Sequence, residues 1–130
     1  MQIAKQLATL FLVTSLVPLT SMGTEQQALK CDIGPVKKIY GKTQWLVYSC
    51  SDNKTVVVVS DTGNPAMPFY FTFYPKQGGY HLTGEGTGKK EATAAAFNDL
   101  EKMTESDIKT LISETVQINE QKKNDRNKLP

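Results

Sequence analysis

Apolar and polar residues alternate with a period of two along the middle of the chain, and with a helical period towards its end. In the middle, runs of β-branched and aromatic residues are separated by the turn-forming clusters SDNK, DTGNPAMP and PKQGG, which is typical of strands joined in sequence. The run TVVVVS is apolar on both faces and indicates a central strand. The predicted strands are Lys30–Ile39, Gln44–Cys50, Thr55–Ser60, Phe69–Tyr74 and Tyr80–Glu85.

The pattern changes after GEGTG, where KKEATAAAFNDLEKM combines strong helix formers with apolar residues at helical spacing. Thr104 and Asp107 form a capping-box signature for a second helix. Strands first and helices last predict an α+β fold, an antiparallel sheet of about five strands with two C-terminal helices packed on one face. We expect one domain over residues 24–118, followed by a polar tail over residues 119–130 that frays.

In the stretch FYFTFY the three phenylalanines share one face of the strand, which we expect to lie under the helices. If KQGG is the turn that follows, Tyr74 faces His81 on the other side of the sheet. The predicted outer face consists of Tyr70, Thr72, Tyr74, His81, Thr83 and Glu85. Tyrosines on a rigid sheet suit the binding of a peptide, protein or glycan, although strand propensity alone also favours Tyr and Thr on a solvent-facing side.

Residues 1–23 have the parts of a secretory signal peptide. Lys5 supplies the positive charge, residues 7–19 are uncharged and mostly apolar, and small residues precede the polar segment that begins at Thr24. The apolar run of about 13 residues is shorter than the roughly 20 that a membrane-spanning helix needs. We therefore expect cleavage after Gly23, a periplasmic or secreted protein, and no integral membrane segment after processing.

The two cysteines of the chain then lie in an oxidising compartment, where a disulfide between Cys31 and Cys50 is expected. A hairpin that turns at Tyr40-Gly41 would place the two cysteines opposite each other, with Cα atoms about 4.5–5.5 Å apart, within the range of a disulfide. A bulge at Gly34-Pro35 would shift this register, so the disulfide and the register are separate predictions.

Charge excludes one class of function. The chain has 15 Lys and Arg against 13 Asp and Glu, and removal of Lys5 with the signal peptide leaves 14 basic residues and a formal charge of +1. Both signs are interspersed along the sequence. Nucleic-acid-binding proteins need a clustered basic face, so we expect no nucleic-acid partner.

Catalytic motifs are sparse. The triplet Asp61-Thr62-Gly63 resembles the catalytic triplet of aspartic proteases, but the resemblance covers three residues, and this chain lacks the later apolar-apolar-glycine segment of those nearly all-β enzymes. We interpret it as a turn. The segment GEGTGKK before a helix could cradle an anion, but it departs from the phosphate-loop pattern, and we interpret it as a turn and helix start. His81 is the single histidine, so neither a metal site nor a cofactor is expected.

Two hypotheses about function follow. The first is a small exported, non-enzymatic binding protein, such as an inhibitor or immunity-type protein of the cell envelope. It would present its sheet face or the DTGNPAMP loop to a protein, peptide or glycan. The alternative is a small hydrolase that uses Asp61 or Glu85. An enzyme needs titratable groups that converge in a cleft, and the sequence shows only scattered ones.

Overall fold

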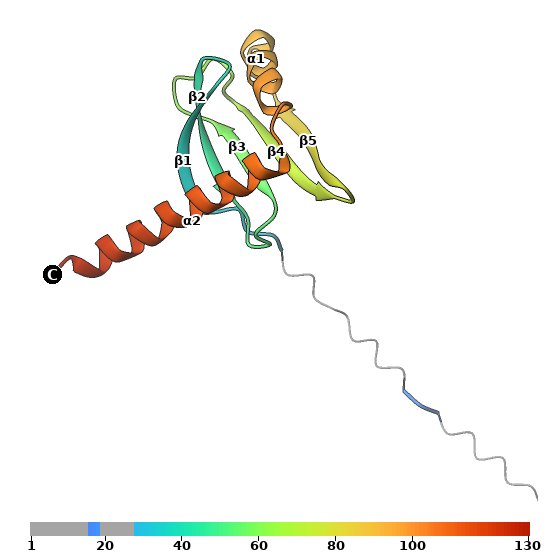
Figure 1. Ribbon diagram of the computed structural model, residues 1–130, viewed down its shortest axis with the longest axis vertical. Coiled ribbons are helices and arrows are strands. Elements are labelled where there is room, and N and C mark those ends of the chain that lie inside the picture. The colour runs from blue at the N-terminus through green and yellow to red at the C-terminus, as the bar shows by residue number, and fades with distance from the viewer. Residues whose placement is uncertain (1–15, 19–27) are drawn as a thin grey trace, which may run out of the picture.

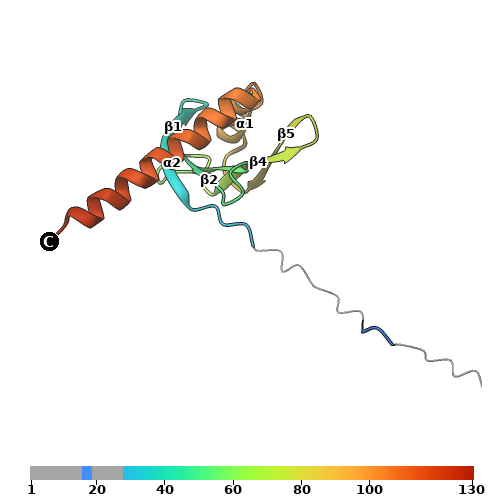
Figure 2. The same cartoon turned by 60° about the horizontal axis from the view of Figure 1, so that its bottom comes forward.

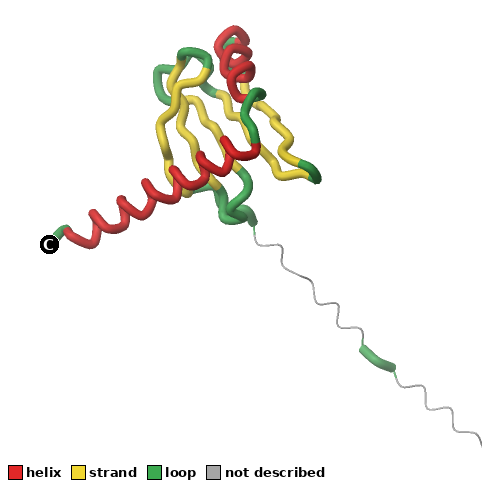
Figure 3. Tube along the Cα trace, in the orientation of Figure 1, coloured by secondary structure: helices red, strands yellow, loops and turns green. Residues whose placement is uncertain are grey.

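The computed structural model describes residues 16–18 and 28–130, so the predicted signal peptide and its cleavage point fall almost entirely outside the described residues. The described part of the chain forms a five-stranded sheet followed by two helices (Figures 1 and 3). The elements are β1 (Ile33–Tyr40), β2 (Thr43–Ser49), β3 (Val56–Ser60), β4 (Phe69–Lys76), β5 (Gly79–Gly86), α1 (Lys90–Leu100) and α2 (Glu105–Lys128). The predicted α+β fold is confirmed.

The sheet is a simple antiparallel meander in the order β1-β2-β3-β4-β5, so β3 lies in the centre as predicted. The β4–β5 register also agrees with the prediction, because Phe73 pairs with Leu82 and Tyr74 pairs with His81. The strands continue to the pair Lys76 and Gly79, so β4 ends two residues closer to the turn than expected and β5 begins one residue closer.

Both helices pack on one face of the sheet and form a single core with it (Figure 2). Every second side chain of a strand points into this core, because successive side chains of a strand face opposite sides of the sheet. The buried core residues are Trp45, Val47, Val56, Val58, Phe71 and Phe73 from the sheet, Ala66 from the β3–β4 loop, and Ala96, Leu100, Ile108, Leu111 and Ile112 from the helices. No described element covers the opposite face, which we call the outer face.

Helix α1 is held against the turn between β1 and β2. Gly41 has a φ of +56°, and an added Cβ would lie 2.4 Å from the backbone nitrogen of Ala96, so only glycine allows this approach. The backbone N–H of Gly41 donates to Oδ2 of Asp99 at 2.6 Å. The turn and the helix therefore fix each other.

Helix α2 crosses the strands β1, β2 and β3. Its predicted capping box is present, since the side chains and backbones of Thr104 and Asp107 bond reciprocally. A buried hydrogen bond of 2.7 Å joins the hydroxyls of Ser49 and Thr115, and it satisfies two polar groups that burial would otherwise penalise. The helix then continues to Lys128, through the polar segment that we expected to fray, and extends beyond the sheet (Figure 1).

The predicted disulfide between Cys31 and Cys50 is present. The predicted register of its hairpin is wrong, because β1 and β2 pair Tyr40 with Thr43 and therefore turn at Gly41-Lys42. Both turn residues have positive φ, the conformation of tight hairpin turns whose twist matches the strands. Lysine seldom adopts this conformation, so a turn at Gly41-Lys42 was not predicted from the residue types. A bulge between Ile33 and Val36 then shifts the register again.

Candidate functional site

The residues predicted for the outer face lie together on β4 and β5. Tyr70 stands between Val59 of β3 and Glu85 of β5 in one row across the sheet. In the next row Thr72 stands between Val57 and Thr83. The pairing of Tyr74 with His81 completes the set.

These side chains differ in accessibility. Tyr70 and Tyr74 expose 41% and 46% of their surface, whereas Thr72 exposes 2% although it lies on the same face. Thr72 has a tyrosine two residues away in each direction along its strand and Val57 and Thr83 beside it in the adjacent strands, and these neighbours surround its short side chain. A binding partner would reach the two tyrosines and not Thr72. The outer face also carries Ile39, at the opposite edge of the sheet, which is 62% exposed.

The hydroxyl of Tyr70 donates a hydrogen bond of 2.5 Å to Oε2 of Glu85. This bond and the negative charge of the carboxylate raise the pKa of Tyr70 above its ordinary value, because both favour the protonated phenol. The contact directs the hydroxyl of Tyr70 towards β5 on the outer face. It also leaves the second carboxylate oxygen of Glu85 open to a further donor.

A cavity of about 290 Å³ opens beside Tyr70, where the β3–β4 loop meets the end of β5. Met67 and Pro68 of the DTGNPAMP segment form one wall, and Val59 and Tyr70 of the sheet form another. Met67 is 52% exposed at its rim. The cavity therefore joins the two features that the sequence singled out separately, the tyrosine face and the loop.

Asp61, the candidate catalytic carboxylate, takes part in the loop structure. Its side chain accepts hydrogen bonds from Nε2 of Gln44 at 2.7 Å and from the backbone N–H of Thr62 at 2.8 Å. Its carbonyl oxygen accepts from the N–H of Asn64, which is the bonding of a turn. This arrangement agrees with the interpretation of Asp61-Thr62-Gly63 as a turn.

The segment GEGTGKK also has a structural use. A Cβ added to Gly88 would lie 1.7 Å from the carbonyl oxygen of Ala66, so the backbone of the β3–β4 loop fills the space beside this glycine. The N–H of Lys89 donates to the carbonyl of Pro65 at 3.1 Å. The segment fastens the start of α1 to the loop that forms the outer cavity.

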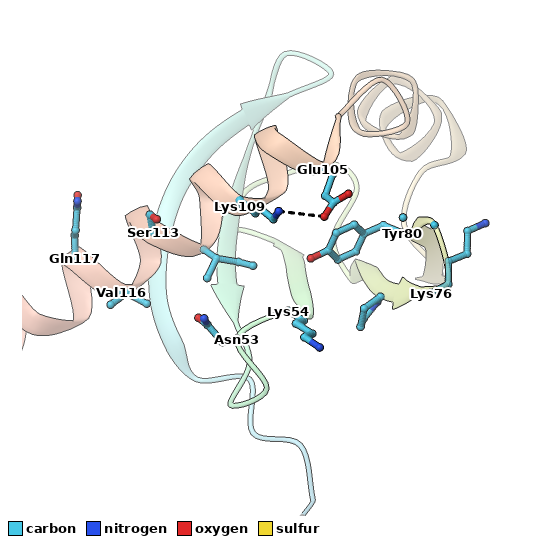
Figure 4. Close-up of a pocket in the computed structure, with 13 residues that line it drawn as sticks. Asn53, Lys54, Lys76, Tyr80, Glu105, Lys109, Ser113, Val116 and Gln117 are labelled. Atoms are coloured by element: carbon cyan, nitrogen blue, oxygen red, sulfur yellow. Dashed lines mark ion pairs between the residues drawn. The ribbon is translucent and has the colours of Figure 1, made fainter.

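A second and larger hollow lies on the helix side of the sheet, and the sequence analysis missed it (Figure 4). It is a groove of about 1030 Å³ between α2, the β2–β3 turn and the β4–β5 hairpin, and Lys54, Lys76, Lys109 and Glu105 are among its lining residues. Lys109 pairs with Glu105 at 3.2 Å. Burial and the charge of Glu105 raise the pKa of Tyr80, which projects into the groove (Figure 4). No sequence signal links these segments, because they come from three separate parts of the chain.

The described residues contain no group of three or more His, Cys, Asp or Glu side chains that could hold a metal ion. No helix among them has the length and apolar character needed to cross a membrane. No family model, curated protein or solved structure matches the chain.

Proposed function

We propose that this protein is an exported, non-enzymatic binding protein that engages a partner protein of the cell envelope through its outer sheet face. The observation that carries the proposal is the cavity beside Tyr70, which lies next to exposed aromatic side chains on a rigid sheet. A single apolar side chain of the partner would enter the cavity. The surrounding contacts would exclude water from it, which is the arrangement found around the residues that dominate interface energies.

The composition of the face favours a protein partner. Apolar residues from the central strands, Leu46, Val57 and Val59, are half-buried in the middle of the face. Polar residues such as Lys37 and His81 lie towards its two edges. An apolar centre with a polar rim is the anatomy of protein interfaces.

The contacts of the two candidate catalytic carboxylates support binding over hydrolysis. Asp61 is engaged by Gln44 and Thr62, and Glu85 is engaged by Tyr70. His81 and Glu85 lie in different rows of the sheet, opposite Tyr74 and Tyr70 respectively. These carboxylates therefore serve the local structure, and the hydrolase remains the alternative hypothesis.

Export is the second part of the proposal. The disulfide between Cys31 and Cys50 supports it, because disulfides persist in oxidising compartments and are rare in the cytosol. N-terminal sequencing of the protein from the envelope or secreted fraction tests it. We expect a first residue near Thr24, and an intact Met1 in that fraction would contradict a cleaved signal.

The binding site is tested by photo-crosslinking. A photo-reactive residue placed at Met67 or Tyr74 should yield a covalent adduct with one protein of the envelope extract. The same probe at Gln117, which lines the groove on the opposite face, should yield none. Adducts from position 117 alone would refute the outer face and make the groove the binding site.

Substitutions provide the matched comparison. Replacing Tyr70 and Tyr74 together by Ser should abolish capture of the crosslinked partner, since aromatic residues near the centre of an interface carry much of its energy. Asp61→Asn should leave capture intact. Loss of capture with Asp61→Asn and retention in the double variant would reverse the assignment and favour the loop.

A further inference from the structure

The two edge strands of the sheet differ in how well they are protected against pairing. Strand β1 contains Pro35, which has no N–H to donate, a bulge, and the two lysines Lys37 and Lys38. It also lies against α2. These are devices by which proteins prevent edge-to-edge association. The sheet is therefore closed to a further strand at this side.

Strand β5 carries none of these devices. Its sequence GYHLTGEG has no proline and no lysine or arginine, and its pairing with β4 is regular throughout. It ends the sheet, and Figures 1 and 2 show its free edge on the outside of the molecule. Within residues 28–130 no further strand pairs with its outward backbone groups, so they form a template for an added strand.

We propose that β5 pairs with β5 of a second copy of this chain, antiparallel and about a two-fold axis through Thr83. The sequence of the strand is complementary to itself in this register. Glu85 of the second copy faces His81. Gly84 of the second copy faces Leu82, and Gly86 of the second copy faces Tyr80. Each contact occurs twice, as an isologous two-fold interface requires.

On the outer face, the axis brings a hydrogen-bond donor, the imidazole of His81, to an acceptor, the carboxylate of Glu85. His81 would lie beside the carboxylate oxygen of Glu85 that Tyr70 leaves free. In the adjacent strand β4, His81 has Tyr74 as its neighbour and Glu85 has Tyr70. No lysine or arginine of β4 therefore lies directly beside the proposed pair. The pair of Thr83 residues at the axis is also a favourable cross-strand contact.

On the helix side, large residues would meet small ones. Leu82 and Tyr80 are only half-buried and border the core. The ring of Phe69 covers Gly84 and Gly86, because a Cβ on either glycine would lie 2.9 Å from a ring atom. Leu82 and Tyr80 of the second copy would pack against this ring, and an aromatic residue opposite a glycine is a known means of stabilising sheets.

The dimer would have one continuous sheet of ten strands, ended on both sides by the protected strand β1. It would place the tyrosines of both copies on one surface. The proposal does not rest on the proposed function, because its test measures only the association of this chain with itself and uses no partner protein.

Sedimentation equilibrium of the disulfide-bonded protein tests the proposal. We expect a concentration-dependent equilibrium between monomer and dimer. His81→Glu replaces two attractive pairs with two repulsive ones and should weaken the dimer at least tenfold, about 1.4 kcal/mol. Glu85→His should weaken it similarly. The double variant that exchanges the two residues should restore it to within about threefold of the original dissociation constant.

Lys37→Glu is the control, because it changes the charge of an exposed residue at the other edge. It should leave the dissociation constant unchanged, and thermal unfolding of each variant reports whether its monomer is folded. A monomer at all concentrations up to about 500 μM, roughly the range of weak association, would overturn the proposal. A dimer that responds to Lys37→Glu and ignores the changes in β5 would overturn it equally.

A second measurement does not depend on charge. Thr83→Cys would place two sulfurs at the two-fold axis, where opposed Cα atoms about 4.5–5.5 Å apart allow a disulfide. Mild oxidation should convert this variant to a covalent dimer, whereas Lys37→Cys should form no disulfide-linked dimer under the same conditions. Equal crosslinking of the two variants would show that no specific pairing of β5 occurs.

Discussion

Phe71 and Tyr70 are neighbours in β4 that face opposite sides of the sheet, and replacing each by Ala tests the assignment of faces. Phe71 is 2% exposed, and its ring centroid lies 5.3 Å from that of Trp45 and 4.9 Å from that of Phe69. Tyr70 is 41% exposed and makes its hydrogen bond on the outer face. The two substitutions remove side chains of similar size from very different surroundings.

The expected loss at Phe71 has two parts. The buried ring contributes about 1.5–3 kcal/mol of transfer free energy. A residual cavity of roughly 50–100 Å³ adds about 1–2.5 kcal/mol at ~24 cal/mol per Å³. The free energy of unfolding should therefore fall by about 3–5 kcal/mol. Tyr70→Ala leaves no buried cavity, so its loss should stay below about 1 kcal/mol.

Urea denaturation followed by circular dichroism measures both values. At a slope of about 2 kcal/mol per M, a loss of 4 kcal/mol moves the midpoint by about 2 M. Tyr70→Ala should move it by less than about 0.5 M. Equal shifts at the two positions, or a larger shift for Tyr70→Ala, would refute the assignment of faces.

Three further predictions concern the disulfide, the first hairpin turn and the half-buried phenol of Tyr40. Replacing Cys31 and Cys50 by Ala should lower the free energy of unfolding by about 3 kcal/mol, and free thiols titrated in the native, non-reduced protein would contradict the disulfide. Gly41→Ala should lower the thermal midpoint strongly, because the added Cβ meets the backbone of α1, whereas Gly78→Ala, in open space, should reflect only the strain of positive φ. Burial and then Glu114 raise the pKa of Tyr40 to about 12. Below the unfolded pKa of about 10, the phenol is neutral in both the folded and the unfolded protein, and its contribution to stability is fully present. Between about pH 10 and 12 the phenol ionises in the unfolded protein first, so this contribution is lost as the pH rises. Tyr40→Phe should flatten the dependence of the free energy of unfolding on pH in this range. An unchanged slope would contradict the assignment of this dependence to Tyr40.

The sequence alone predicted features that depend on neighbouring residues. Alternation in FYFTFY separated the buried Phe71 and Phe73 from the exposed Tyr70 and Tyr74, because the period of a strand is local. The capping box at Thr104 was predicted for the same reason, since its partner lies three residues away. The disulfide was predicted from the presence of two cysteines in a chain expected to be exported.

The surfaces were decided by tertiary structure. The cavity beside Tyr70 exists because the β3–β4 loop folds against the end of β5, and the groove exists because α2 covers β1 to β3 and leaves the β4–β5 hairpin open. The turn at Gly41-Lys42 was also decided by tertiary structure, because α1, which is distant in the sequence, packs against it. Periodicity records which side of an element is apolar. It carries no information about which distant segment packs against that element. These tertiary contacts determine the shape of the cavity beside Tyr70 and of the groove.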